Sequence, residues 1–180
     1  MISPPHVAFR KIPRWSRDIV ITEKIDGTNA CIYIAESGLF LTGSRNRWTT
    51  PDDDNYGFSK WAHERQEELL TLGKGFHWGE WWGQGIQRGY GITEKRFSLF
   101  NVSLWRTSPV RPPCCSVVPV IYSGPLTEDA IREALERIQY AGSYAAPGFQ
   151  NPEGIVIFHT ASGHLYKKTC KDDEKPKGTT

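Results

Sequence analysis

The stretch EKIDG, residues 23–27, follows the apolar run Ile19-Val20-Ile21 and decides how the rest of the chain is interpreted. The apolar run predicts a buried strand, and Asp26-Gly27 is a turn dipeptide that would end the strand and bend the chain. Lys24 would then stand at the mouth of the strand. An amine that attacks a phosphate needs such a rigid position, among groups that hold the phosphate. The competing interpretation is a solvated hairpin corner.

Composition predicts an ordinary globular domain. The chain has 180 residues, of which 38% are hydrophobic and 23% are charged, enough for one domain with a substantial core. It has no apolar run that could span a bilayer and no signal-peptide core at the start, so we expect a cytoplasmic protein without a membrane partner. We expect residues 1–170 to form the domain and the charged residues 171–180 to form a flexible tail.

Charge and cysteine content indicate little about partners. A net charge of +2 is too small to indicate nucleic acid unless the basic residues gather on one face. The four cysteines lack the spacing of a zinc site, and reduced thiols are the expectation.

The first half of the chain predicts mainly strands. The pattern indicates an antiparallel meander of strands 19–24, 30–35 and 39–42 after an irregular leader, residues 1–18, packed on the domain by its aromatics. A helix over about 57–72 is expected, and then a strand over 75–82. The glycine-rich residues 83–91 lack the ending of a phosphate loop and are interpreted as a flexible connector.

The second half predicts two more strands, a helix and a hairpin. Strands are expected over 96–105 and 117–122. Thr127 can cap a helix that Gly142 would end. Residues 154–159 and 164–169 predict a hairpin joined by four turn residues.

Five further short motifs accompany EKIDG in a fixed order. They are Ser44-Arg45-Asn46, Gly79-Glu80, Phe97 to Asn101, Glu153-Gly154 and Lys167-Lys168. Together the six motifs resemble the covalent nucleotidyltransferase superfamily of polynucleotide ligases and messenger-RNA capping enzymes. Within it the chain looks most like an ATP-dependent RNA ligase of the nick-sealing type. The resemblance spans roughly residues 9 to 170 and implies an α+β adenylyltransferase domain. Such a domain has two packed, largely antiparallel sheets with flanking helices, and the nucleotide lies in the groove between them.

The resemblance implies a role for each motif. Lys24 would attack the α-phosphate of ATP and carry AMP through a phosphoramide bond. Glu23 would contribute backbone hydrogen bonds to the adenine edge, and Glu80 would accept one from a ribose hydroxyl. Phe100 would stack on the base. The family usually has aspartate where this chain has Asn101.

Two motifs would contact phosphate or metal. Arg45 would bind the ribose or a substrate phosphate. Glu153 matches a carboxylate that coordinates Mg²⁺ or Mn²⁺ bridging phosphate oxygens.

The pair Lys167-Lys168 departs from the Lys-x-Lys of the relatives. Adjacent residues on a strand point to opposite faces, so only one amine can reach the phosphate unless a bulge intervenes. A hairpin loop of two or four residues would place Lys168 on the face of Ile155 and Glu153, and a loop of three would place Lys167 there. Alignment of the motif favours Lys167, and both remain candidates.

The implied partner is nucleic acid, either RNA ends or a nicked duplex. Relatives often carry a C-terminal domain that grips the duplex, so a partner protein that supplies this grip is a further expectation. A minimal DNA ligase and a non-catalytic nucleic-acid-binding relative of the fold are the alternatives.

Overall fold

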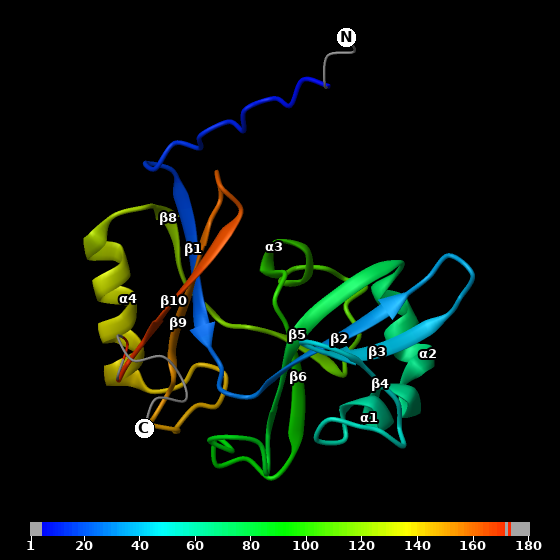
Figure 1. The fold of residues 1–180 in the computed structure, drawn as a ribbon. Coiled ribbons are helices and arrows are strands. Elements are labelled where there is room, and N and C mark those ends of the chain that lie inside the picture. Colours follow the sequence, from blue (N-terminus) through cyan, green and yellow to red (C-terminus); the bar gives the residue numbers. More distant parts are fainter. Residues whose placement is uncertain (1–4, 172, 174–180) are drawn as a thin grey trace.

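The chain folds into two β-sheets that lie side by side, with helices on their outer faces (Figure 1). This computed structural model describes residues 5–171 and residue 173; most of the predicted tail, 171–180, lies outside the described residues. One sheet has four strands in the order β10-β9-β1-β8, and the other has six in the order β4-β3-β2-β5-β6-β7. All neighbouring strands are antiparallel except the pair β6 and β7. The predicted α+β class with two largely antiparallel sheets is confirmed.

The strands of the four-stranded sheet come from both ends of the chain. They are β1 (Asp18–Lys24), β8 (Val120–Pro125), β9 (Gly154–His159) and β10 (His164–Thr169). The six-stranded sheet is built from the middle of the chain. Its strands are β2 (Thr28–Ile34), β3 (Phe40–Ser44), β4 (Trp48–Thr49), β5 (Gly75–Gly83), β6 (Lys95–Leu99) and β7 (Cys115–Val117).

Helix α4 (Glu128–Ala141) covers the outer face of the four-stranded sheet (Figure 1). Its buried residues Ala134 and Ile138 pack on Ile19, Ile21 and Ile155 of β1 and β9. The predicted cap is confirmed, because the Thr127 hydroxyl accepts a hydrogen bond from the N–H of Ala130 at 3.0 Å. No helix in the described part of the chain is long and apolar enough to cross a membrane.

Helices α1 (Phe58–Glu64) and α2 (Gln66–Leu69), followed by the 3₁₀ turn η1 (Leu70–Leu72), cover the outer face of the six-stranded sheet. The sequence predicted one helix here. It is broken at Arg65, whose backbone leaves helical geometry at φ −119° and ψ 19°. Phe58 packs on Trp81 and Phe97 of the sheet, with ring centroids 5.5 and 5.0 Å away.

The predicted meander is wrong at its first step. Strand β1 pairs with β8 and β9, while β2 pairs with β3 and β5, so the chain crosses from one sheet to the other at residues 25–27. The physical reason is that both edges of β1 are filled by strands from the distant C-terminal half. An Asp-Gly turn bends the chain, but it carries no information about which strand pairs next.

Two further strand predictions differ from the structure, one in length and one in continuity. The strand over 96–105 ends at Leu99, because the Asn101 side chain accepts a hydrogen bond from the N–H of Leu104 and caps α3 (Val102–Trp105). The strand over 117–122 is divided at residues 118–119 into β7 and β8, which belong to different sheets.

Two segments whose packing was predicted from composition also differ from those predictions. The glycine-rich link, residues 83–91, is not a loose connector: Ile86 is fully buried and Tyr90 is 2% exposed. Of the described leader residues, Trp15 stacks its ring on His159 with centroids 5.8 Å apart, and the Arg17 carbonyl accepts from the N–H of Leu126 at 2.9 Å. Residues 5–14 are exposed and extend away from the body (Figure 1).

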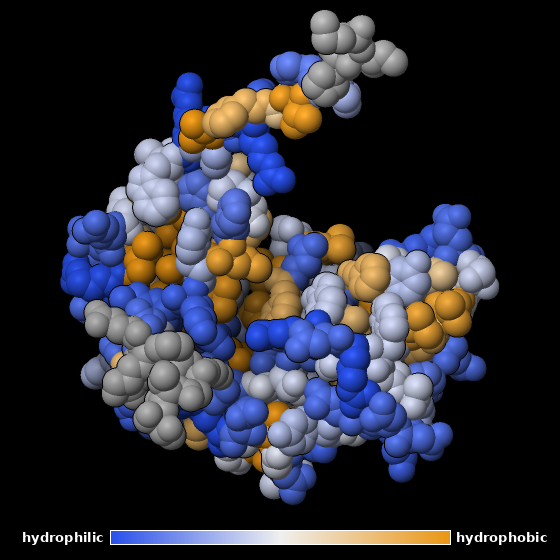
Figure 2. All heavy atoms as spheres, in the orientation of Figure 1, coloured by the Kyte–Doolittle hydropathy of each residue, from blue (hydrophilic) through white to orange (hydrophobic). Residues whose placement is uncertain are grey.

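A third core cluster joins the two sheets. It contains Ile25 and Val118 from the crossovers between the sheets, Trp82 from the end of β5, and Tyr90 and Ala146 from loops. Above this junction the molecular surface is hollowed between the two sheets (Figure 2). The fold therefore places the end of β1 at the base of an open groove.

Candidate active site

Lys24 ends β1 and meets a buried carboxylate. Its Nζ atom donates to Glu153 Oε2 at 2.7 Å, and the side chains are 20% and 3% exposed. Glu153 directly precedes β9, whose first residue, Gly154, pairs with Lys24. The strand pairing therefore brings together two residues that are 129 positions apart.

Glu80 of β5 lies on the other side of the same cavity. Its Oε1 atom accepts from the N–H of Gly27 at 3.0 Å, and its Oε2 atom accepts from Asn29 Nδ2 at 2.9 Å. Asn29 Oδ1 in turn accepts from Arg45 Nε at 2.8 Å. The cavity has a volume of about 270 Å³ and is lined by Lys24, Asp26, Gly27, Thr28, Asn29, Arg45 and Glu80.

The protonation of Glu80 is set by its surroundings. Burial raises the pKa of this carboxyl to about 7, although the charge of Lys24 and the bonds from Gly27 and Asn29 oppose the rise. The charge of Glu153 adds to the rise. Since a raised pKa in a cleft is typical of functional carboxyls, this feature supports the sequence-based choice of Glu80.

Glu23 points away from Lys24. Its carboxylate accepts from the Ser143 hydroxyl at 2.6 Å and from the N–H groups of Tyr144 and Ala145, both at 2.8 Å. Its own N–H donates to the carbonyl of Pro119 at 2.9 Å. Burial raises the pKa of the Glu23 carboxyl. The side chain thus fixes the end of β1 to the loop after α4, and only the backbone carbonyl is left for the predicted adenine contact.

Phe100 follows β6 and faces the groove by register. Glu80 pairs with Ser98, and the N–H of Phe100 continues the ladder by donating to the carbonyl of Trp78 at 2.9 Å. Phe100 is therefore on the sheet face that carries Glu80. Its side chain is 39% exposed, and it does not line the cavity around Lys24. Its role in stacking stays a prediction.

The register of the last hairpin separates the two candidate lysines. Thr22, Val156 and Lys167 pair in one row across β1, β9 and β10, on the face that Lys24 shares. Glu23, Ile155 and Lys168 pair in the neighbouring row, which faces α4.

The four-residue loop thus puts Lys168 on the face of Ile155, as expected. Glu153 precedes the strand, however, so strand alternation does not apply to it and its carboxylate reaches Lys24 instead. Lys168 lies 3.3 Å from Asp173 Oδ2.

Sequence reasoning missed four polar residues around Lys24. Asp26 was interpreted only as a turn residue, but its Oδ2 atom accepts from Arg88 Nε at 2.9 Å and its N–H donates to the Tyr90 hydroxyl at 2.7 Å. Arg88 also donates to the carbonyl of Asn151 at 3.0 Å. The alternation of β2 could have shown Asn29, but Arg88 and Tyr90 lie in a loop whose pattern carries no such signal.

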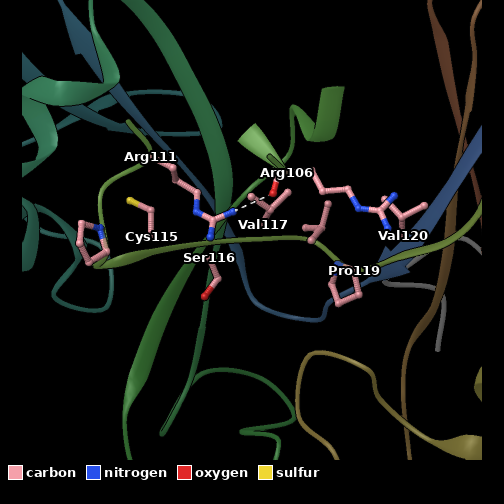
Figure 3. Close-up of a pocket in the computed structure, with 9 residues that line it drawn as sticks. Arg106, Arg111, Cys115, Ser116, Val117, Pro119 and Val120 are labelled. Atoms are coloured by element: carbon pink, nitrogen blue, oxygen red, sulfur yellow. Dashed lines mark hydrogen bonds between the residues drawn. The ribbon is translucent and has the colours of Figure 1, made fainter. Parts of the chain in front are cut away.

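A larger cavity lies elsewhere and contains none of the predicted site residues. It has a volume of about 390 Å³, and Arg106, Arg111 and Ser116 are among the residues that line it (Figure 3). Arg111 uses its Nη1 atom to bind the carbonyl of Trp105 at 3.0 Å. The candidate site is therefore identified by the residues that line the smaller cavity, and not by cavity volume.

The donor set fits a divalent cation that is shared with phosphate. Among the described residues, no group of three or more His, Cys, Asp or Glu could hold a metal by itself. Glu153 nevertheless supplies a buried carboxylate oxygen beside Lys24. Mg²⁺ and similar ions are usually bound by one or two carboxylates, with water and substrate phosphates completing the shell.

Two sheets flanking a groove, with a lysine amine between two buried carboxylates, define the class of nucleotidyltransferase-fold proteins. The chain belongs to the RNA ligase family, whose model matches residues 17–169. This match confirms the resemblance to the RNA ligases that the six motifs indicated.

Solved structures of Naegleria gruberi RNA ligase share the fold. A variant with ATP and Mn matches at 19% identity and a TM-score of 0.62, over 86% of this chain and 50% of that chain. The ligase with PPi matches at 19% identity and a TM-score of 0.61, over 84% and 49%. The chain thus spans about half the length of these ligases. No curated protein matched the chain.

Proposed function

We propose that the chain is an ATP-dependent RNA ligase that works through a covalent lysyl-AMP intermediate. The observation that carries the proposal is the Lys24 amine at the end of β1, 2.7 Å from Glu153 and beside the cavity that Glu80 lines. The intact set of Lys24, Glu80 and Glu153 argues against a non-catalytic relative. The complexes of Naegleria gruberi RNA ligase with ATP or AMP and Mn support nucleotide and divalent-metal use here.

The first step would transfer AMP to the protein. The lone pair of Lys24 Nζ attacks the α-phosphorus of ATP, an N–P bond forms, and the P–O bond to pyrophosphate breaks. The Glu153 carboxylate would orient the amine and accept its proton. Glu80 would accept a hydrogen bond from a ribose hydroxyl, and Arg45 and Lys167 would bind phosphate oxygens. A divalent cation held by Glu153 would supply neutralisation of the phosphate charge.

Two further transfers would complete ligation. A 5′-phosphate oxygen of the nucleic acid attacks the AMP phosphorus and releases Lys24. A 3′-hydroxyl then attacks the activated 5′-phosphate, which forms the phosphodiester bond and releases AMP. Cytoplasmic location and a partner that helps to grip the nucleic acid stay predictions.

The test is self-labelling with α-labelled ATP and Mg²⁺ or Mn²⁺. We expect wild type to take up label in an acid-labile bond, since a phosphoramide is acid-labile, and Lys24→Ala to take up none. Lys60→Ala, which changes an exposed lysine of α1, is the matched control and should label normally. An acid-stable label, or a label on Lys24→Ala, would contradict the proposal.

The substrate is tested by sealing of nicked RNA, DNA and hybrid duplexes. Preference for RNA supports the family assignment of the activity. Equal or better sealing of nicked DNA favours the minimal DNA ligase instead.

A further inference from the structure

Four aromatic side chains, three of them exposed and one half-buried, form a continuous strip on the groove face of the six-stranded sheet. They are Tyr33 of β2, Trp48 of β4, and Phe76 and Trp78 of β5, and we call them the aromatic strip. Trp48, Phe76 and Trp78 are 48%, 56% and 39% exposed. The helices cover the opposite face of this sheet, and these rings are not part of the core there.

The rings contact one another in sequence along the sheet. Phe76 and Trp78 are nearly parallel, with an interplanar angle of 8° and centroids 6.5 Å apart. Trp48 stacks beside Phe76 at 6.0 Å and 20°, and Tyr33 lies 4.6 Å from Phe76. Folding normally buries large aromatic rings, so an exposed row of them indicates a binding surface.

The aromatic strip is continuous with the candidate active site. Trp78 and Glu80 are two residues apart on β5 and therefore lie on the same face. Tyr33 pairs with Phe76, and Asn29 pairs with Glu80, in the same ladder. The hydrogen bonds from Glu80 through Asn29 to Arg45 link the cavity to the β3–β4 turn, which directly precedes Trp48.

Charge at the edge of the strip favours an anionic partner. Arg45 and Arg47 are exposed beside Trp48; Arg45 binds a neutral amide, and Arg47 pairs with Asp53. The strip itself contains no acidic side chain. Figure 2 shows pale and orange atoms over β2, β3 and β5, with blue, hydrophilic atoms along their border.

We propose that the aromatic strip binds unpaired bases of a single-stranded RNA end and leads that strand to Lys24. Aromatic rings on a sheet beside arginines suit single strands, because every base has a face that stacks and every linkage carries a negative charge. A duplex keeps its bases stacked inside and cannot use the rings in this way. The proposal rests on the proposed function, which it deepens by naming a single-stranded segment as the substrate element.

The experiment measures binding of a fluorescently labelled 12-nucleotide RNA to the full chain. Three ligands are compared, namely the single strand, a blunt duplex of the same sequence, and an abasic ribose-phosphate chain of the same length. We expect wild type to prefer the single strand over both others, with quenching of tryptophan fluorescence. Trp78→Ala and Phe76→Ala should each weaken single-strand binding about tenfold and leave duplex binding unchanged.

Two controls keep the outcome interpretable. Trp78→Phe keeps a stacking ring and should recover most of the affinity. Tyr140→Ala removes an equally large ring that is 92% exposed on α4, and it should bind as wild type does.

Several results would overturn the proposal. These are equal binding of the abasic chain, equal loss with Tyr140→Ala, or wild-type affinity in Trp78→Ala. A dimer that Trp78→Ala converts to monomer in sedimentation would show instead that a second copy covers the strip. Failure of the proposed function would look different, because wild type would bind the single strand yet take up no acid-labile label from ATP.

Discussion

Glu80 combines burial with hydrogen bonds that favour its ionised form. Burial dominates, and it raises the pKa of this carboxyl from 4.5 to about 7. In that interval the folded protein keeps a proton that the unfolded chain has released. The contribution of Glu80 to stability must therefore fall as pH rises from about 4.5 to 7. The ionised form accepts hydrogen bonds most strongly, so contact with a ribose hydroxyl would strengthen over the same interval.

We predict that Glu80→Gln removes much of this dependence. The free energy of unfolding of the variant relative to wild type should rise by about 2 kcal/mol between pH 5 and pH 8, because only wild type must bury a charge at the higher pH. Denaturant titrations of both proteins at the two pH values measure the change. Burial also raises the pKa of Glu23, but this contribution is common to both proteins. A difference that is the same at both pH values would contradict the assignment to Glu80.

Gly27 packs so closely against β5 that a side chain has no room there. A Cβ atom there would lie 2.4 Å from the carbonyl oxygen of Trp81, 2.7 Å from the Cβ of Trp82 and 3.1 Å from the Cγ of Glu80. The backbone must therefore shift for any larger residue. The sequence indicated a turn glycine, whereas the structure shows that close packing of the crossover against β5 requires it.

Gly27→Ala should lower the free energy of unfolding by about 1–3 kcal/mol, as overpacking does, and should slow labelling of Lys24 because Glu80 must move. Thermal or denaturant unfolding and the rate of label uptake measure the two effects. Gly38→Ala is the comparison: its Cβ meets open space at φ +84°, so only the backbone cost of about 1 kcal/mol applies and labelling stays normal. Equal losses of labelling in both variants would rule out a contact effect at Gly27.

At the level of strands and helices, the sequence predicted which segments form strands or helices better than it predicted which strands pair. The apolar alternation and the Thr127 cap sufficed to place β9, β10 and α4, because those signals are local. Pairing depends on which distant edge is open, so the same signals could not show that β1 lies between β8 and β9. The same holds for the candidate site. Short motifs indicated Lys24, Glu80 and Glu153, but no pattern indicated the loop residues that contact the end of β1.

Strand register places Lys167 and Lys168 on opposite faces of the four-stranded sheet. We predict that Lys167→Ala slows labelling of Lys24 about tenfold or more, since this amine shares the groove face and a charged hydrogen bond to phosphate would be lost. Lys168→Ala should stay within about twofold of wild type, because its row faces α4. Single-turnover labelling rates at saturating ATP provide the comparison. A greater defect in Lys168→Ala would mean that the hairpin register changes when nucleotide binds.

The molecule as a whole depends on the packing that joins its two sheets. Arg88, from the loop between β5 and β6, contacts Asp26 at the crossover and the carbonyl of Asn151 ahead of β9. Tyr90 from the same loop packs against Phe149, with centroids 4.7 Å apart. Lys24 comes from one sheet and Glu80 from the other, so these contacts fix the geometry of the groove. The glycine composition of this loop indicated mobility, whereas its buried side chains make it part of the core.

This shared core predicts that the two sheets unfold together. Tryptophan fluorescence reports mainly on the six-stranded sheet, which holds six of the seven tryptophans in or beside it, and far-UV circular dichroism reports strongly on α4, the longest helix. Their urea midpoints should coincide in wild type. Tyr90→Ala should lower both midpoints equally, because removing this ring costs about 3 kcal/mol or more from a cluster that both sheets use. Tyr140→Ala, on the exposed face of α4, should leave both unchanged. If Tyr90→Ala shifts one transition and leaves the other in place, the sheets are separate folding units and the groove between them is not held by this cluster.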